Sequence, residues 1–181
     1  MKCLHIITPV KDSIDSTLET VKAIMESDIL VPFTYTVYND FSTEENTHRL
    51  EEAARQWNFR LVNLSDLTDH PSPNYLLVLQ TAQKEAIEAD AGLLIVESDV
   101  IVKKNTLQSL YNGALQQKQC GIAAAVTTDE KGIINYPYLH AKGHENQVYP
   151  EKKHCSFCCS LLTPGPVSYT HLRAHETRSN L

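Results

Sequence analysis

The sequence lacks the features that place proteins in membranes or on nucleic acids. No apolar run approaches the length of a membrane-spanning helix. The apolar start of the chain is broken at once by Pro9, Lys11 and Asp12, which argues against a signal peptide. Positive charge is scarce as well: the formal net charge is -6, whereas a nucleic-acid surface needs a basic stripe. We therefore expect no membrane segment, no nucleic-acid partner and a cytoplasmic location.

The sequence also lacks the paired cysteine motifs of a structural zinc site. The five cysteines include one C-x-x-C motif, Cys155 to Cys158, and no second such motif or spaced histidine pair completes a four-ligand zinc site. The stretch 156–162 also has the apolar character of a strand, in which residues i and i+3 point to opposite faces. We expect the cysteines to be reduced and mostly buried rather than bound to zinc.

The rest of the sequence describes a globular α/β domain. Its 181 residues are 42% hydrophobic and 21% charged, which is enough for one domain with a sizeable core. Hydrophobic periodicity predicts strands that alternate with helices, and this alternation is typical of an open, mainly parallel sheet flanked by helices. The predicted strands are 3–8, 33–40, 59–64, 91–98, 120–128, 132–139 and 156–162, and the predicted helices are 13–27, 41–57, 75–89 and 105–117.

Local signals refine the ends of these elements. Ser42 and Glu45 have the spacing of a capping box at the start of the second helix. Pro73 suits the first turn of the third helix, where its missing N–H costs nothing. The sequence DEKG, 129–132, is typical of a turn between two strands.

Carboxylates stand at the ends of two predicted strands. Asp40 follows the second strand, and Glu97 and Asp99 follow the fourth. An unpaired buried carboxylate is costly to desolvate, so acids in these places should bind something cationic or protic. Ligands of open parallel sheets lie beyond the carboxyl ends of the strands, so we expect these acids to face a binding crevice.

Four stretches together resemble the nucleotide-sugar-binding half of family 2 glycosyltransferases, which have the GT-A-type (Rossmann-like) fold. That family has a Pro-containing turn after its first strand, a D-D-x-S motif after its second and a D-x-D motif after a later strand. The resemblance covers about Cys3 to Thr127. The stretches that carry it are ITPVKDS, YNDFSTEEN, PNYLLVLQTAQKEA and LLIVESDVIV.

The resemblance implies roles for residues at the first two strand ends. Either Asp40 or, if the motif is aligned one residue earlier, Asn39 would accept hydrogen bonds from the nucleobase. Pro9 and Val10 would line the base pocket. This chain departs from the family pattern at Asn39, which stands where the family has an acid.

At the D-x-D position, the resemblance implies a divalent metal, Mn²⁺ or Mg²⁺, bridging the diphosphate of the donor. Asp99 would bind this metal through a hard carboxylate oxygen. Glu97 replaces the first Asp of the motif and is one methylene longer, so we expect it to hold the ribose or a metal-bound water instead.

The resemblance further implies an inverting transfer from a UDP- or GDP-linked sugar to a saccharide or lipid-linked acceptor. A carboxylate base would deprotonate the acceptor. We expect it downstream, because the candidates Asp129 and Glu130 lie in the predicted turn. A sugar-1-phosphate nucleotidyltransferase is disfavoured, since ITPVKDSID lacks the glycine-rich loop that this class needs. A non-catalytic nucleotide- or glycan-binding module is the other alternative.

The end of the chain breaks the pattern. VSYTHLRAHETRSNL, Val167–Leu181, has no sustained apolar face, and VSYTHLRAHET resembles translated sequencing-adapter DNA. We therefore expect an incomplete nucleotide-sugar-binding domain over 1–163, truncated at its C-terminus, and a non-native, disordered tail over 164–181. Such a fragment should lack transfer activity, because the catalytic base would be missing.

Overall fold

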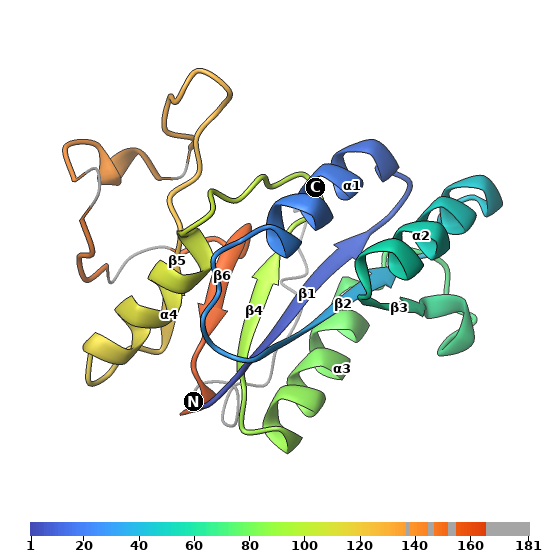
Figure 1. The fold of residues 1–181 in the computed structure, drawn as a ribbon, viewed down its shortest axis with the longest axis horizontal. Coiled ribbons are helices and arrows are strands. Elements are labelled where there is room, and N and C mark those ends of the chain that lie inside the picture. The colour runs from blue at the N-terminus through green and yellow to red at the C-terminus, as the bar shows by residue number, and fades with distance from the viewer. Residues whose placement is uncertain (137, 145–146, 152–154, 166–181) are drawn as a thin grey trace, which may run out of the picture.

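A central six-stranded sheet carries helices on both faces (Figure 1). The computed structural model describes residues 1–136, 138–144, 147–151 and 155–165. The strands are β1 (Leu4–Val10), β2 (Phe33–Asn39), β3 (Arg60–Asn63), β4 (Gly92–Val96), β5 (Ile122–Ala124) and β6 (Cys159–Leu162). The helices are α1 (Ile14–Met25), α2 (Glu44–Trp57), α3 (Tyr75–Glu88) and α4 (Thr106–Gln116), with short 3-10 helices at Leu64–Asp66 and Tyr138–Ala141.

The strand order in the sheet is β3-β2-β1-β4-β6-β5. The first four strands are parallel, whereas β6 runs antiparallel to both β4 and β5. The predicted open, mainly parallel α/β sheet is therefore confirmed. β1 lies between β2 and β4, so the acids after β2 and after β4 stand on either side of the end of β1.

The core has two layers because the strands are covered on both faces. In β4, Leu94 and Val96 belong to the cluster that α1, α2 and α4 cover, while Leu93 and Ile95 pack under α3. This alternation follows the two-residue period of a strand. It also explains why β4 is continuously apolar, as strands covered on both faces are.

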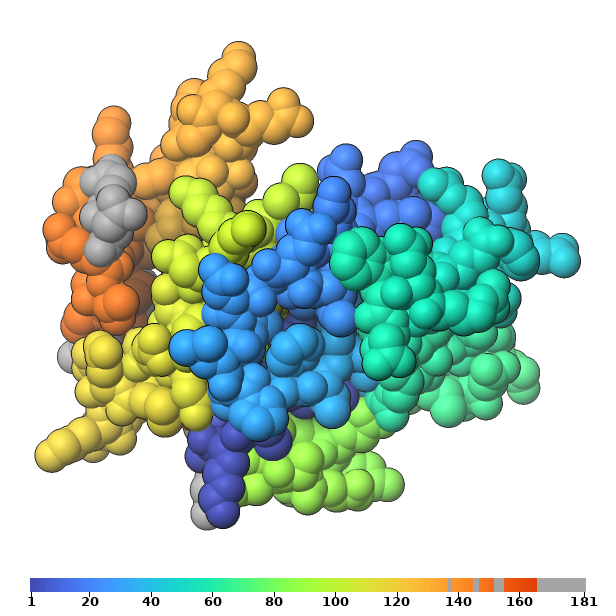
Figure 2. Space-filling model, in the orientation of Figure 1, coloured from blue at the N-terminus to red at the C-terminus, as the bar shows by residue number. Residues whose placement is uncertain are grey.

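The segment between β5 and β6 differs from its prediction. The described residues of 132–139 do not form the predicted strand: their one pairing is a single bridge between Thr128 and Ile134, and Tyr138 already belongs to the 3-10 helix Tyr138–Ala141. The predicted DEKG turn is present, and the Asp129 carboxylate holds it by accepting the N–H groups of residues 131 and 133. The described part of this segment projects from the body of the molecule (gold to orange in Figure 2).

Smaller corrections concern helix starts and cysteines. Thr43, not Ser42, caps α2 by accepting the N–H of Asn46 at 3.3 Å. Pro73 precedes the N-cap residue of α3 and so lies outside its first turn. The five cysteines are free thiols, but of these only Cys159 is buried, which contradicts the expectation of mostly buried cysteines.

Among the described residues, no helix has both the length and the apolar character needed to cross a bilayer. The predicted non-native segment Val167–Leu181 lies outside the residues that the structure describes.

Candidate functional site

The predicted acids lie at one edge of the sheet. β1, β2 and β4 are parallel and end at the same edge, where Asp40 directly follows β2 and Glu97 directly follows β4. The side chains of Tyr38 and Ile95, two residues earlier in each case, face α3. The two-residue period of a strand therefore carries Asp40 and Glu97 to the α3 side as well.

Asp40 is 8% exposed, and the start of α3 surrounds its carboxylate with donors. The Ser72 hydroxyl and the Asn74 backbone N–H donate to Oδ2, and the Asn74 side-chain amide donates to Oδ1, each at 2.8 Å. Burial by itself raises the pKa of Asp40, but these hydrogen bonds outweigh it, and the pKa lies below its usual value. Asp40 is thus held as a carboxylate.

Glu97 is held by a different residue of the same helix start. The Tyr75 hydroxyl donates to Glu97 Oε1 at 2.8 Å, and the Glu97 backbone N–H donates to the Cys158 carbonyl at 2.9 Å. Burial and repulsion by Asp99 raise the pKa of Glu97, and the hydrogen bond from Tyr75 only partly opposes them. Asp99 itself is exposed. The pair therefore combines one anchored carboxylate with one that is open to solvent.

The remaining predicted residues are largely occupied by contacts within the chain. The Asn39 amide donates to Thr47 Oγ1 and Asn63 Oδ1, both at 2.9 Å, while its Oδ1 accepts from the backbone. Pro9 and Val10 are buried at the end of β1. Their predicted contact with a base would therefore involve backbone or an edge of the side chain.

Asp12, which ends the Pro-containing turn after β1, is a further acid at this edge, and the sequence interpretation gave it no role. Its backbone is in the left-handed region, at φ 56°, and its N–H donates to Ser42 Oγ at 2.9 Å. Its Oδ1 accepts the Thr43 N–H at 2.7 Å, and this bond is the largest cause that holds the pKa of Asp12 below its usual value. Asp12 thereby ties the loop after β1 to the start of α2.

Lys11 adds a positive charge at the same edge. Its Nζ donates to the Phe41 carbonyl at 3.2 Å, and its charge contributes to the lowered pKa of Asp40. The edge therefore presents both carboxylates and a cation.

The carboxylates at this edge suit a metal ion that takes most of its oxygen ligands from substrate phosphates and water. No group of three or more His, Cys, Asp or Glu side chains that could hold a metal occurs among the described residues. Mg²⁺ and similar hard cations commonly use only one or two protein carboxylates together with substrate phosphates and water. Glu97 and Asp99 could supply one or two such carboxylates, but they do not form a complete metal site by themselves.

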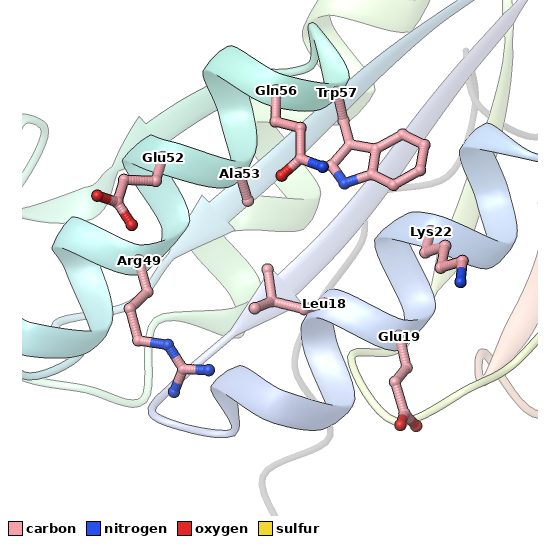
Figure 3. A pocket seen from close by; sticks show the side chains of 8 residues that line it. All are labelled: Leu18, Glu19, Lys22, Arg49, Glu52, Ala53, Gln56 and Trp57. Carbon is pink, nitrogen blue, oxygen red and sulfur yellow. The ribbon is translucent and has the colours of Figure 1, made fainter.

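A separate groove lies between α1 and α2 (Figure 3). It has a volume of about 360 Å³, and Leu18 and Ala53 approach each other between the two helices. Charged side chains from both helices surround it, and none of the acids described above lines it. The hydrogen-bonded carboxylates of Asp40 and Glu97 lie instead at the sheet edge, beside the start of α3.

Comparison of the sequence with protein families and with curated proteins finds no match. Solved structures do resemble the fold. TarS 1-349 of S. aureus is 21% identical with a TM-score of 0.52, and the match covers 67% of this chain and 34% of that one. The mannosyltransferase PcManGT from Pyrobaculum calidifontis, in complex with GDP-Man and Mn²⁺, is 18% identical with a TM-score of 0.55, covering 69% and 35%.

A third similar structure is glucosyl-3-phosphoglycerate synthase from Mycobacterium tuberculosis in complex with UDP. It is 14% identical with a TM-score of 0.54, and the match covers 91% of this chain and 57% of that one. The chain therefore has the fold of GT-A-type glycosyltransferases, as the sequence motifs predicted. It spans about a third of the length of the first two structures.

Proposed function

We propose that this chain binds a nucleoside-diphosphate sugar, with UDP or GDP as the nucleotide, together with Mn²⁺ or Mg²⁺. The observation that supports this most is the convergence of an anchored carboxylate, Asp40, and a partly open acidic pair, Glu97 and Asp99, at the carboxyl edge of parallel strands. One of the similar structures is a complex with GDP-Man and Mn²⁺ and another is a complex with UDP, which is consistent with such a ligand.

In this proposal Asp99 binds the metal directly, whereas Glu97 does not contact the metal itself. The exposed carboxylate of Asp99 is free to approach a metal that the diphosphate also binds. Glu97 is half-buried and already accepts the Tyr75 hydroxyl, so it suits the ribose or a metal-bound water. A bound metal would offset the negative charge of the departing diphosphate.

Asp40 would recognise the base with the acceptor capacity that remains. A carboxylate has about four lone-pair sites. Ser72 and Asn74 occupy three of them, two on Oδ2 and one on Oδ1. One site on Oδ1 is left for a single N–H of a base, with Pro9 and Val10 beside it and Asn39 supporting the loop.

Glycosyl transfer itself is proposed for a longer parent protein. We propose an inverting, family 2-like transfer to a saccharide or lipid-linked acceptor in the cytoplasm. The base that deprotonates the acceptor would lie beyond residues 1–163. Asp129 is engaged in holding its own turn, which disfavours it as that base. In this proposal, residues 164–181 are foreign and the present chain binds donor without transferring it.

A calorimetric titration with UDP and with GDP, each with and without Mn²⁺, tests the proposal. Asp99→Asn should remove the part of the nucleotide affinity that depends on Mn²⁺ and leave the fold intact. Glu97→Gln should have a smaller effect, because it loses part of a hydrogen bond rather than a metal ligand. Asp15→Asn is the matched control, since this exposed acid of α1 pairs with Arg49 outside the site.

Three results would count against the proposal. If the wild-type chain bound neither nucleotide, nucleotide binding would be refuted. If Asp99→Asn kept the full response to Mn²⁺, the metal assignment would be wrong. Binding that is indifferent to Mn²⁺ would favour the alternative of a non-catalytic binding module.

A further inference from the structure

We propose that the four residues Ser72–Tyr75, at the start of α3, position both acidic parts of the site. Ser72 and Asn74 set the Asp40 carboxylate, and Tyr75 sets the Glu97 carboxylate. This inference rests on the proposed function, because it assigns roles in base recognition and in metal binding. It gives positioning roles to residues for which the strand-end motifs and the fold resemblance imply none.

The hold on Asp40 is multiple and largely buried. Asn74 is 8% exposed and donates through both its backbone N–H and its side-chain amide. The same amide also donates to the His70 carbonyl at 3.0 Å, which fixes its orientation within the loop. Ser72 adds a third donor at 2.8 Å. Because both carboxylate oxygens are engaged, the plane of the Asp40 carboxylate is determined by this segment.

The hold on Glu97 comes from one hydroxyl. Tyr75 is the first residue of α3, and its ring packs against the cluster that α3 buries on the sheet. The hydroxyl reaches Glu97 Oε1 at 2.8 Å. A ring with two side-chain torsions that is fixed by packing holds a carboxylate more firmly than a flexible chain would. In this proposal the second oxygen, Oε2, serves the ribose or a metal-bound water.

The body of α3 makes this segment a rigid support. Val78, Leu79 and Ala82 are buried under the sheet, so the first turn of the helix cannot shift without disturbing the core. One structural element thus reaches the acid after β2 and the acid after β4, on either side of the end of β1. Hydrogen-bonded partners behind metal-site groups commonly change metal affinity by about 10- to 100-fold when they are removed.

Three single variants test the assignment in the full chain: Tyr75→Phe, Ser72→Ala and the control Tyr111→Phe. Tyr111 is a half-buried tyrosine of α4 whose hydroxyl donates to a backbone carbonyl at 3.2 Å, away from the acids. Each variant is titrated with UDP and GDP, with and without Mn²⁺, and its thermal midpoint is measured. Mn²⁺ binding without nucleotide is followed by electron paramagnetic resonance.

Tyr75→Phe should weaken the Mn²⁺-dependent part of nucleotide affinity by about tenfold or more and leave metal-free binding unchanged. Ser72→Ala should weaken metal-free binding by about two- to tenfold, because one hydrogen bond that orients Asp40 is lost, and leave the Mn²⁺ increment unchanged. Tyr111→Phe should change neither quantity, even if it lowers the thermal midpoint as much as Tyr75→Phe does.

The positioning role is wrong if Tyr75→Phe and Ser72→Ala both bind nucleotide and Mn²⁺ as the wild type does. It is also wrong if each variant lowers both quantities only in proportion to its loss of stability. By contrast, wild-type protein that binds no nucleotide in any condition would refute the proposed function, and with it the roles assigned to this segment. The two failures are therefore distinguishable.

Discussion

Replacing Asp40 by Ala should destabilise the fold in a way that the structure quantifies. The variant removes the acceptor of three hydrogen bonds, each 2.8 Å long, from Ser72 and Asn74. The half-buried Ser72 hydroxyl can turn to water, but both donors of Asn74 are in a residue that is 8% exposed. Leaving a buried donor unsatisfied costs about 1–3 kcal/mol. We therefore expect Asp40→Ala to lower the free energy of unfolding by about 3–5 kcal/mol.

Urea unfolding at several pH values measures this loss and tests its electrostatic origin. The pKa of Asp40 is lower in the folded state than in the unfolded state, where it is about 3.9. Its contribution is therefore fully present above that value and is lost as the pH falls through the folded-state pKa. The difference between the wild type and Asp40→Ala should be constant from about pH 7 to pH 5 and should shrink below about pH 4.

Asp40→Asn is the matched control, because it keeps the volume and one acceptor oxygen. It should cost less than Asp40→Ala, since the Asn74 amide can reverse and accept from the new amide at the expense of its bond to the His70 carbonyl. A loss below about 1 kcal/mol for Asp40→Ala at pH 7 would refute the reasoning. That result would mean that water replaces the carboxylate for Asn74 without cost.

Three further variants probe packing and charge. Gly113→Ala in α4 should stabilise the fold by about 0.5–1 kcal/mol, because a Cβ there would come no closer than 3.7 Å to Val148. Gly92→Ala should instead lower the free energy of unfolding by about 1–3 kcal/mol, because its Cβ would lie 2.9 Å from the buried Leu161 side chain. Urea unfolding of the two variants shows whether one is stabilised and the other destabilised. Burial lowers the pKa of His5 in the folded state below the value of about 6.5 that it has in the unfolded state. Just below about pH 6.5 the unfolded state therefore binds more protons than the folded state, and the free energy of unfolding should fall as the pH drops through that window. His5→Gln should lose this slope, and an unchanged slope would show that other groups cause it.

The apolar pattern predicted the sheet well because its strands are covered on both faces. β1, β2 and β4 lie where continuous apolar or β-branched runs placed them, and the acids follow them at the carboxyl edge as expected. Such runs are a direct consequence of burial, so they can be recognised in a single sequence. The fold resemblance drawn from the strand-end motifs is confirmed by the similar structures.

Features that depend on two distant segments were not predicted. The contacts of Ser72 and Asn74 with Asp40 join residues more than thirty positions apart, and the sequence predicts the stretch around Pro73 only as the start of a helix. The predicted strand 132–139 failed for a related reason. Its residues have β propensity, but a strand also needs a partner, and this segment projects from the sheet.

The central claim is that a divalent metal and a nucleotide meet at the carboxyl edge of β1, β2 and β4. Paramagnetic broadening of backbone amide signals by a small amount of Mn²⁺, in the presence of UDP and then of GDP, tests it most directly. The proposal predicts that amides near Ser98 and Asp99 broaden first, followed by those near Asp40 and Tyr75. Broadening centred on the groove between α1 and α2, or no localised broadening with either nucleotide, would contradict it.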